Sequence, residues 1–568
     1  MSRNAESRFA VNPTRIDISR STFDRSSSLK TSFNVGDIVP FYVDEVLPGD
    51  TFKIRTSKVI RLQTLLTPVM DNIYLDTYFF FVPNRLTWDH WKEFNGENTA
   101  SAWVPSTEYN IPQITSPATT GWSVGTIADY FGIPTGVAGL SVSALPFRAY
   151  ALIINEWFRD QNLQDPLVVP TDDSTVAGVN SATFVTDVAK GGKPYVASKY
   201  HDYFTSCLPA PQKGPDVTIP VLAGGQFPVI STTSEIDMSL NTSPLYLRSN
   251  ASQVSESRVY SSPYVLQASS SASGGFNVAG TKQIGDSGWM DDDETRNLYA
   301  PANLWTSVGT NLATATINQL RLAFQIQKLY ERDARGGTRY IEILKSHFGV
   351  TSPDARLQRP EYLGGNRLPI TVNQVVQQSG TGSASETPQG TVVGQSLTTD
   401  SHHDFVKSFT EHGFVIGVMV ARYPHTYQQG LERFWSRLDR FDYYWPVFAN
   451  IGEQAVKNRE IFAQGVSQDD EVFGYQEAWA DYRYKPSRVT GEMRSSYAQS
   501  LDVWHLADDY SALPSLSASW IQEDKSNVDR VLAVTSQVSN QLFCDIFVQN
   551  KTTRPMPLYS VPGLIDHH

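Results

Sequence analysis

The sequence is poor in cysteine and in charge. Only two of its 568 residues are cysteines, Cys207 and Cys544, which are too few and too far apart for a disulfide framework or a thiolate metal site. We therefore expect two reduced, buried thiols in a cytoplasmic product. The charged fraction of 18% lies below the roughly 25% usual for globular chains, whereas 37 glycines and 32 prolines accompany many Ser, Thr, Asn and Gln. This mixture favours strands joined by long polar loops.

Long apolar runs are also missing. No stretch approaches the roughly 20 residues needed to span a bilayer, and the start, MSRNAESRF, has no apolar signal-peptide core. We expect a soluble protein that is not exported by that route. The net charge of -12 argues against a chain that coats nucleic acid over its whole surface, because neutralising phosphates needs clustered Lys and Arg. Any contact with nucleic acid must be local.

Alternating and β-branched runs predict an all-β core. These patterns lie at residues 53–55, 59–62, 73–82, 412–420, 528–534 and 542–548, and Pro-Gly and Pro-Asn turn signals bound the early ones. Strands near both ends of so long a chain predict one sandwich domain with large insertions.

Two helices are expected within the insertions. The first begins at Leu145, where Pro146 suits the first turn, and it places Tyr150, Ile153, Ile154, Trp157 and Phe158 on one face that should pack against the sheets. The second begins at Thr316, with Gln319 completing a capping box, and ends ahead of Gly336-Gly337.

Composition divides the chain into four segments. Residues 1–30 form a basic arm, which either touches nucleic acid or is a solvated terminus. Residues 31–221 and 299–568 hold the two parts of the sandwich, the first with the helical insertion. Residues 222–298 between them are polar, with a Ser-rich run at 269–275, and read as a surface insertion. A second polar tract runs from Gln377 to Asp400, and neither tract is expected to fold alone.

Three short motifs resemble functional sites, but their surroundings or spacing argue against each function. Gly285–Gly288 reads GDSG, as around a chymotrypsin-like nucleophile, but a triad would lack support in this polar insertion. Asp291–Glu294 lacks the spacing of an EF-hand and reads as a solvated acidic turn. His402–Asp404 has no third metal partner and reads as a polar loop. No catalytic residue and no metal ligand is assigned.

Other enzyme signatures are missing from the sequence. It contains no Walker-type phosphate loop, no dinucleotide fingerprint and no His-Glu-x-x-His zinc helix. Asp508-Asp509 offers paired carboxylates, but glycoside hydrolysis depends on their separation in space, which a sequence does not give.

Five segments carry a family resemblance. They are LPFRAYALIINEWFRDQNLQ (145–164), KYHDYFTSCLPAPQK (199–213), ARYPHTYQQGLERFWSRLDRFDYYWPV (421–447), FGYQEAWADYRYKPSRVTGEMR (473–494) and RPMPLYSVPGLIDHH (554–568). In this order they resemble the major capsid protein (F/VP1 type) of the Microviridae, gokushovirus branch. The resemblance runs from SRFAVNPTRIDISRSTFDRS near the start to the last residue and weakens only in the two polar tracts.

The resemblance implies an eight-stranded antiparallel jelly roll with long loop insertions. It implies that many copies build a small T=1 icosahedral capsid around a circular single-stranded DNA genome, in a virion assembled in the bacterial host cytoplasm. The insertion at 222–298 matches the one that forms threefold protrusions and is thought to face the host. The implied partners are further copies of the chain, the genome, a small basic DNA-packaging protein, scaffolding and pilot proteins, and a host surface receptor.

Two groups of residues are candidates for contacts. Arg3, Arg8, Arg15 and Arg20 are hypothesised to contact phosphates without sequence preference. Tyr443, Tyr444 and Trp445 either bury at subunit contacts or fill the sandwich core. No cofactor is expected, and the sequence leaves open a structural divalent cation between subunits. The alternative function is an all-β glycan-binding module or glycosidase, because jelly rolls and aromatic loops also suit sugars.

Overall fold

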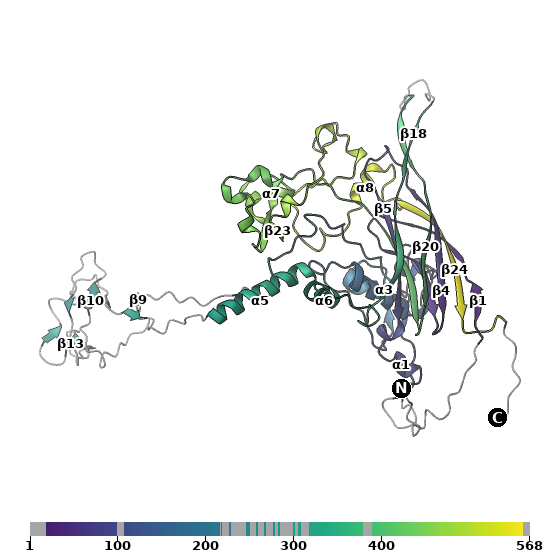
Figure 1. The fold of residues 1–568 in the computed structure, drawn as a ribbon, viewed down its shortest axis with the longest axis horizontal. Coiled ribbons are helices and arrows are strands. Elements are labelled where there is room, and N and C mark those ends of the chain that lie inside the picture. The colour runs from purple at the N-terminus through teal and green to yellow at the C-terminus, as the bar shows by residue number, and fades with distance from the viewer. Residues whose placement is uncertain are drawn as a thin grey trace. The chain divides into compact units, whose positions relative to one another are not determined.

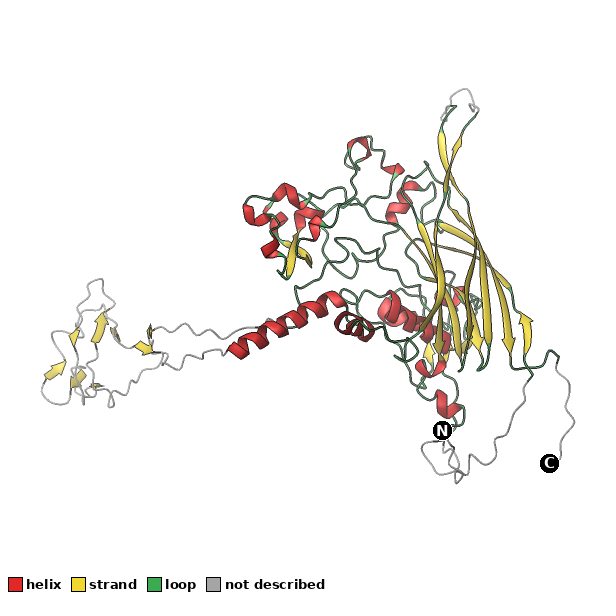
Figure 2. Cartoon of the chain, in the orientation of Figure 1, coloured by secondary structure: helices red, strands yellow, loops and turns green. Residues whose placement is uncertain are grey.

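The computed structural model describes residues 19–98, 107–215, 217, 317–378 and 389–559, and between 226 and 307 the backbone of short strands. Antiparallel sheets dominate, and the helices are few (Figure 2). The chain divides into unit 1, Met1–Gly214 with Leu329–His568, and unit 2, Pro215–Lys328. The predicted all-β character is confirmed.

Two sheets form the sandwich of unit 1 (Figure 1). The first, here called the open sheet, has the order β1 (Ser21–Asp24), β24 (Leu542–Arg554), β4 (Thr51–Leu62) and β20 (Thr398–Ser408), with β2 (Ser27–Phe33) also paired to β24. The second, the covered sheet, has the order β17 (Glu361–Pro369), β5 (Tyr74–Pro83), β21 (Gly413–Arg422) and β3 (Val39–Val46). Every pairing in both sheets is antiparallel.

The main core lies between the two sheets. β4 alternates buried and exposed residues along its length, and its inward side chains Phe52, Ile54 and Ile60 join this core. The covered sheet contributes Phe79 and Met419 from its inner face. Because side chains alternate across a strand, the outer faces of the two sheets must be explained separately.

Helix α3 (Leu145–Ile153) covers the outer face of the covered sheet and continues into a π-helical turn, Ile154–Phe158. Phe147 and Tyr150 of α3 share a second apolar cluster with Phe80 of β5 and Ile416 of β21. The predicted helix and its apolar face are confirmed, since Tyr150, Ile153 and Ile154 are buried and Trp157 and Phe158 pack against the same cluster.

The other helices and strands of unit 1 are short. They are α1 (Trp91–Phe94), β6 (Gln113–Thr115), α2 (Ile127–Tyr130), β7 (Ser141–Ser143), β8 (Val176–Ala177), α4 (Phe184–Asp187), α6 (Tyr340–Phe348), β18 (Val372–Val376), β19 (Val392–Ser396), β22 (Glu453–Lys457), α7 (Asn458–Ile461), β23 (Val472–Glu477) and α8 (Ser526–Val531). Helix α5 (Ile317–Gly336) runs through the boundary between the units and ends where the sequence predicted.

Unit 2 holds short strands in small antiparallel sheets. They are β9 (Gln226–Pro228), β10 (Tyr246–Ser249), β11 (Ser257–Arg258), β12 (Leu266–Ala268), β13 (Phe276–Val278), β14 (Lys282–Ile284), β15 (Tyr299–Pro301) and β16 (Trp305–Ser307). The predicted insertion 222–298 falls within this unit. Most of it, including Gly285–Gly288 and Asp291–Glu294, lies outside the described residues, as does Thr316.

Two sequence predictions are wrong. Residues 528–534 do not form a strand, because α8 occupies Ser526–Val531 with Val528 and Val531 buried at the i, i+3 spacing of a helix face. His402–Asp404 is not a loop, because it lies in β20, where His402 pairs with Thr56 and His403 with Arg55. The polar tract 377–400 contains β19, which pairs with β18, and it includes the first residues of β20.

Candidate assembly surface

The long connection from β21 to β24, residues 423–541, forms a loop module on the sandwich. It has a small core of its own, where Tyr427, Val456 and Ile461 pack against Tyr203 and Phe204. Tyr203 stacks on Tyr484 with ring centroids 5.2 Å apart and planes 8° from parallel. The module is therefore a folded structure that can present a defined surface.

An exposed apolar stretch, here called the aromatic surface, runs through residues 431–451 of this module. Its exposed members are Leu431, Phe434, Trp435, Leu438, Phe441, Tyr443, Tyr444, Trp445, Val447 and Ile451. Tyr443, Tyr444 and Trp445 are 52%, 44% and 51% exposed, so the alternative that they fill the sandwich core is wrong. So many large apolar side chains on one exposed stretch are typical of a surface that contacts a partner.

Several rings of this surface are held in place from within the chain. Trp445 donates its indole N–H to the carbonyl of Arg440 at 2.8 Å. The Arg437 guanidinium lies 4.3 Å from the ring of Tyr482 and 5.3 Å from that of Tyr443, and it is paired with Asp481. These contacts reduce the entropy that the side chains would lose when a partner binds.

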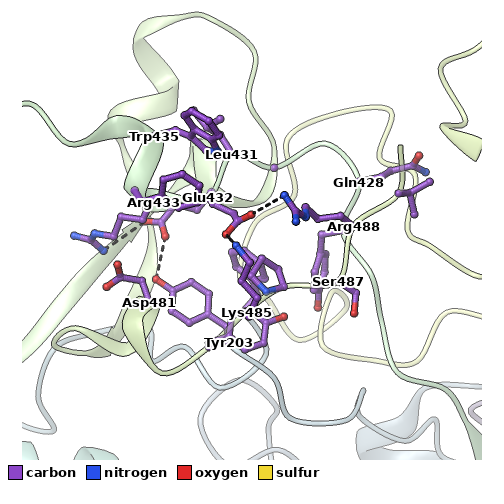
Figure 3. Close-up of a pocket in the computed structure, with 18 of the residues that line it drawn as sticks. Tyr203, Gln428, Leu431, Glu432, Arg433, Trp435, Asp481, Lys485, Ser487 and Arg488 are labelled. Atoms are coloured by element: carbon purple, nitrogen blue, oxygen red, sulfur yellow. Dashed lines mark hydrogen bonds and ion pairs between the residues drawn. The ribbon is translucent and has the colours of Figure 1, made fainter. Parts of the chain in front are cut away.

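A pocket of 620 Å³ opens beside the aromatic surface, and Figure 3 shows its lining. Trp435, which is 67% exposed, and Arg433 are among the residues that line it. Glu432 bonds Lys485 and lies 3.7 Å from Arg488. The walls of the pocket therefore combine aromatic rings with cationic side chains, which carboxylates of the same module partly neutralise.

Glu460 of α7 also lines this pocket. Its carboxylate accepts a 2.9 Å hydrogen bond from the Tyr203 hydroxyl and lies 3.5 Å from Arg433. Burial raises the pKa of Glu460, and the charge of Arg433 opposes that rise only in part. Glu460 therefore ties the 199–213 segment to α7.

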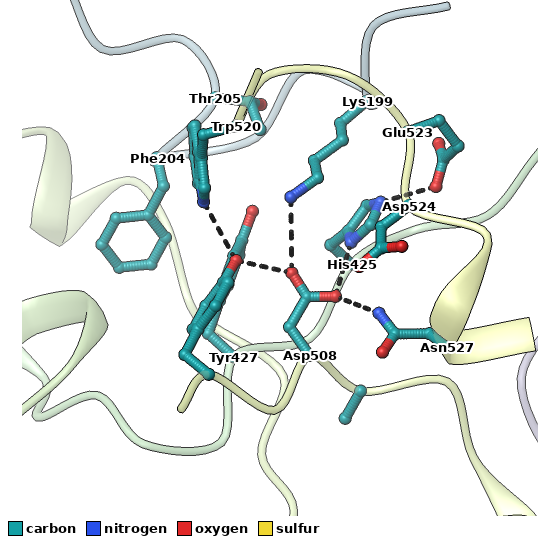
Figure 4. A network of polar contacts seen from close by, with 12 residues as sticks. Lys199, Phe204, Thr205, His425, Tyr427, Asp508, Trp520, Glu523, Asp524 and Asn527 are labelled. Carbon is teal, nitrogen blue, oxygen red and sulfur yellow. Dashed lines mark hydrogen bonds and ion pairs between the residues drawn. The ribbon is translucent and has the colours of Figure 1, made fainter. Parts of the chain in front are cut away.

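A buried network of charges anchors the loop module at its root (Figure 4). The ring of His425, three residues after β21, bonds Asp508 through Nδ1 and Glu523 through Nε2, both at 2.8 Å. Lys199 lies 3.6 Å from Asp508, and Asn527 of α8 donates to the same carboxylate at 2.6 Å. All five side chains are buried, so the network joins four distant chain segments away from water.

The protonation of this network follows from its geometry. Burial alone lowers the pKa of His425, but the charges of Asp508 and Glu523 and the hydrogen bonds to them outweigh burial and raise that pKa to about 9. Burial opposes the ionised form of Asp508, yet the His425 charge and hydrogen bond hold its pKa well below the ordinary value. The imidazolium is thus held between two carboxylates by two hydrogen bonds, one from each ring nitrogen.

Sequence reasoning missed this network. His425 and Asp508 are 83 positions apart, and no local pattern indicates that they meet. The Asp508-Asp509 pair considered for glycoside hydrolysis is divided by the fold, since Asp508 is buried in the network and Asp509 is exposed.

The predicted arm is described only near its end. Arg3, Arg8 and Arg15 lie outside the described residues. Arg20 is exposed and donates to the Gly49 carbonyl and to the Thr51 hydroxyl, at the start of β4. Arg25 forms a two-pronged pair with Asp44, with N to O distances of 2.7 and 2.6 Å. The last residues of the predicted arm therefore lie in the sandwich.

The described residues show neither a metal-binding cluster nor a membrane-spanning helix. Within those ranges no group of three or more His, Cys, Asp or Glu is placed to hold a metal ion. Across the same residues, no helix has the length and apolar character needed to cross a membrane. Cys207 and Cys544 are both buried and unpaired with each other, as the sequence predicted.

Comparison with known proteins identifies the family. Residues 12–564 match the model of the capsid protein (F protein) family. Capsid protein VP1 of Spiroplasma virus 4 is 46% identical, with 94% of this chain and 93% of the relative covered. The VP1 proteins of Chlamydia phage 1 and Bdellovibrio phage phiMH2K are each 43% identical, with 98% and 99% of this chain and 98% of each relative covered. The resemblance to the gokushovirus branch of the Microviridae is thus confirmed, and the chain belongs to the capsid protein (F protein) family.

Proposed function

We propose that the chain is a major capsid protein that self-assembles into a T=1 icosahedral shell around a circular single-stranded DNA genome. Its role is structural rather than enzymatic. The observation that carries the proposal is the family match over residues 12–564, together with an exposed aromatic surface on a chain of that family. Burial of such a surface between copies would supply apolar contact area, and its surrounding charges would supply the polar rim.

The sandwich is proposed to be an eight-stranded jelly roll. Two sheets of antiparallel strands in the orders β2-β24-β4-β20 and β17-β5-β21-β3 support this reading. Long insertions between β5 and β17 and between β21 and β24 fit a capsid subunit, in which loops rather than strands differ most between relatives.

Electron microscopy of the purified protein, together with its sedimentation profile, tests the proposal. Uniform closed particles are expected, formed by the chain alone or after co-expression with scaffolding proteins. If only monomers form in both cases, the proposal fails and the glycan-binding alternative gains support. As a sharper variant, Trp435→Ser with Tyr444→Ser should prevent particles while leaving the subunit folded, because both side chains are exposed.

Host attachment by the insertion and contact of the arm with DNA are the further proposed roles. Deleting residues 250–280 should impair adsorption to the host in particles that still assemble, and unchanged adsorption would refute the attachment role. Replacing Arg3, Arg8, Arg15 and Arg20 by Gln should lower the packaged DNA, and an unchanged ratio of DNA to protein would refute that role.

A further inference from the structure

The outer face of the open sheet is an exposed surface that no contact described so far uses. In Figure 1 the helices of unit 1 lie on the other side of the sandwich from this sheet. Along β4 and β24 every second residue points away from the core. The exposed residues on these two strands are Lys53, Arg55, Val59, Arg61, Phe543, Asp545, Phe547 and Lys551.

This face is basic although the whole chain is acidic. It carries five cationic side chains, those of Lys30, Lys53, Arg55, Arg61 and Lys551, against the carboxylates of Asp24 and Asp545. The chain as a whole has a net charge of -12. Lys30 lies 3.8 Å from Asp545, whereas none of the ion pairs within the described residues involves Lys53 or Arg61. Cationic side chains without carboxylate partners favour the binding of a polyanion to this face.

Two phenylalanines stand out of the same face. Phe543 and Phe547 are 38% and 47% exposed, and a spacing of four residues on one strand separates them by about 13 Å. The strand register sets Phe543 between Ser32 and Arg61. Likewise Phe547 lies between Ser28 and Ser57. Each ring thus has a hydroxyl beside it, and one has a guanidinium as well.

We propose that this sheet face binds single-stranded DNA, with unpaired bases stacked on Phe543 and Phe547 and phosphates bound by Lys53, Arg55 and Arg61. Exposed rings with flanking cations and hydroxyls match the way single strands are bound without sequence preference. A duplex would not use the rings, because its bases are already stacked. This inference rests on the proposed function in that the genome is the DNA available to a coat subunit.

The position of Arg20 fits this assignment. It contacts Thr51, which stands on β4 two residues before Lys53. Any strand of DNA that lies along β4 would therefore meet an arginine at the end of the face. The arm and the sheet face would then act on the same polyanion.

Oligonucleotide binding by the soluble subunit tests the rings. In fluorescence anisotropy with a labelled poly-dT strand, Phe543→Ser with Phe547→Ser should weaken binding about tenfold or more. The same variant should bind a DNA duplex of equal length with the same affinity as the unchanged protein. Equal loss for both forms of DNA, or loss for neither, would overturn the stacking role.

The cations are tested by a variant that carries Lys53→Gln, Arg55→Gln and Arg61→Gln. The slope of log affinity against log salt should become shallower by about 2, because about 0.7 counterion is released for each phosphate contact on a single strand. The matched control, with Lys92→Gln, Lys345→Gln and Arg356→Gln, removes the same charge from exposed positions elsewhere and should keep the slope. Equal slopes for both variants would overturn the inference.

Particle analysis separates this inference from the proposed function. If the unchanged chain forms no particles, the proposed function fails whatever the subunit binds. If the variant with Lys53→Gln, Arg55→Gln and Arg61→Gln forms particles with normal DNA content and binds poly-dT normally, only the sheet-face inference fails. If that variant forms no particles and binds poly-dT normally, the face is a contact between proteins and the inference is also overturned.

Discussion

The two sheets of the sandwich share one core but have opposite outer faces. On the covered sheet, Val418 and Ile416 of β21 are fully buried beneath α3 and its neighbours. On the open sheet, the corresponding outward positions of β4 are Lys53, Arg55 and Arg61, all exposed. The burial pattern of β4 alternates, whereas β21 is buried at almost every position. A strand that is apolar throughout therefore indicates a second layer, and an alternating strand indicates a free face.

The two outer faces also differ in what they can do. The outer face of the covered sheet is part of a second apolar core, which it shares with α3. The open sheet has a free face on which charge and exposed rings cost little stability. Substitutions on the two outer faces should therefore have very different effects, and matched pairs of variants can test that difference.

The largest effect is expected from a charge placed under the covering layer. Val418→Asp would bury a carboxylate without a partner, which should cost about 3 to 5 kcal/mol of unfolding free energy. Urea denaturation and soluble yield measure this loss. Val59→Asp is the control on the open sheet, where the side chain is 36% exposed, and it should change stability by about 0.5 kcal/mol or less. Similar losses in both variants would contradict the contrast.

A matched pair of phenylalanines compares the faces without new charge. Phe80 is 1% exposed and lies 5.3 Å from the ring of Trp157, so Phe80→Ala should cost about 3 to 5 kcal/mol. Phe547→Ala removes the same atoms from the open face, where the ring is 47% exposed, and should cost about 1 kcal/mol or less. Thermal and urea unfolding measure both values. A larger cost for Phe547 would mean that another part of the chain covers the open face.

The buried network at the root of the loop module should make stability depend on pH. The pKa of His425 is raised from 6.5 to about 9 in the folded chain. The stability that protonated His425 gives the folded chain is therefore complete below about pH 6.5 and is lost as the pH rises through about 9. A shift of this size corresponds to about 3 kcal/mol.

Unfolding free energy measured between pH 6 and 10 checks this dependence. His425→Gln should remove most of the fall at alkaline pH, because the charge between Asp508 and Glu523 no longer changes. The control is His403→Gln on the open sheet, whose side chain is exposed and which should leave the curve as it was. An unchanged curve for His425→Gln would show that the imidazolium does not hold the network together.

The sequence predicted strands and helices where periodicity was strong. The alternation in β4, the continuous apolar run in β5 and the face of α3 were all readable locally. The pattern at 528–534 misled because Val528 and Val531 fit a helix face as well as a strand. The order of the strands was not readable, since β2 pairs with β24 more than 500 residues later.

The candidate sites were predictable only in part. Aromatic residues at 443–445 suit a core and a surface equally, so their exposure required the fold. The His425 network depends on contacts across 83 and 98 positions. The basic face was hidden because its residues come from strands that are distant in sequence, and only the sheet register sets Arg61 beside Phe543.

The smallest effect is expected for the ion pair between Lys30 and Asp545 on the open face. Lys30 and Asp545 are 3.8 Å apart, with side chains 75% and 54% exposed, so water and salt screen their attraction. A double-mutant cycle with Lys30→Ala and Asp545→Ala should give a coupling below about 0.5 kcal/mol that vanishes in high salt. A coupling above 1 kcal/mol would mean that the pair is shielded from water, which would contradict an open face. A small coupling instead leaves Lys30 free to exchange Asp545 for a phosphate.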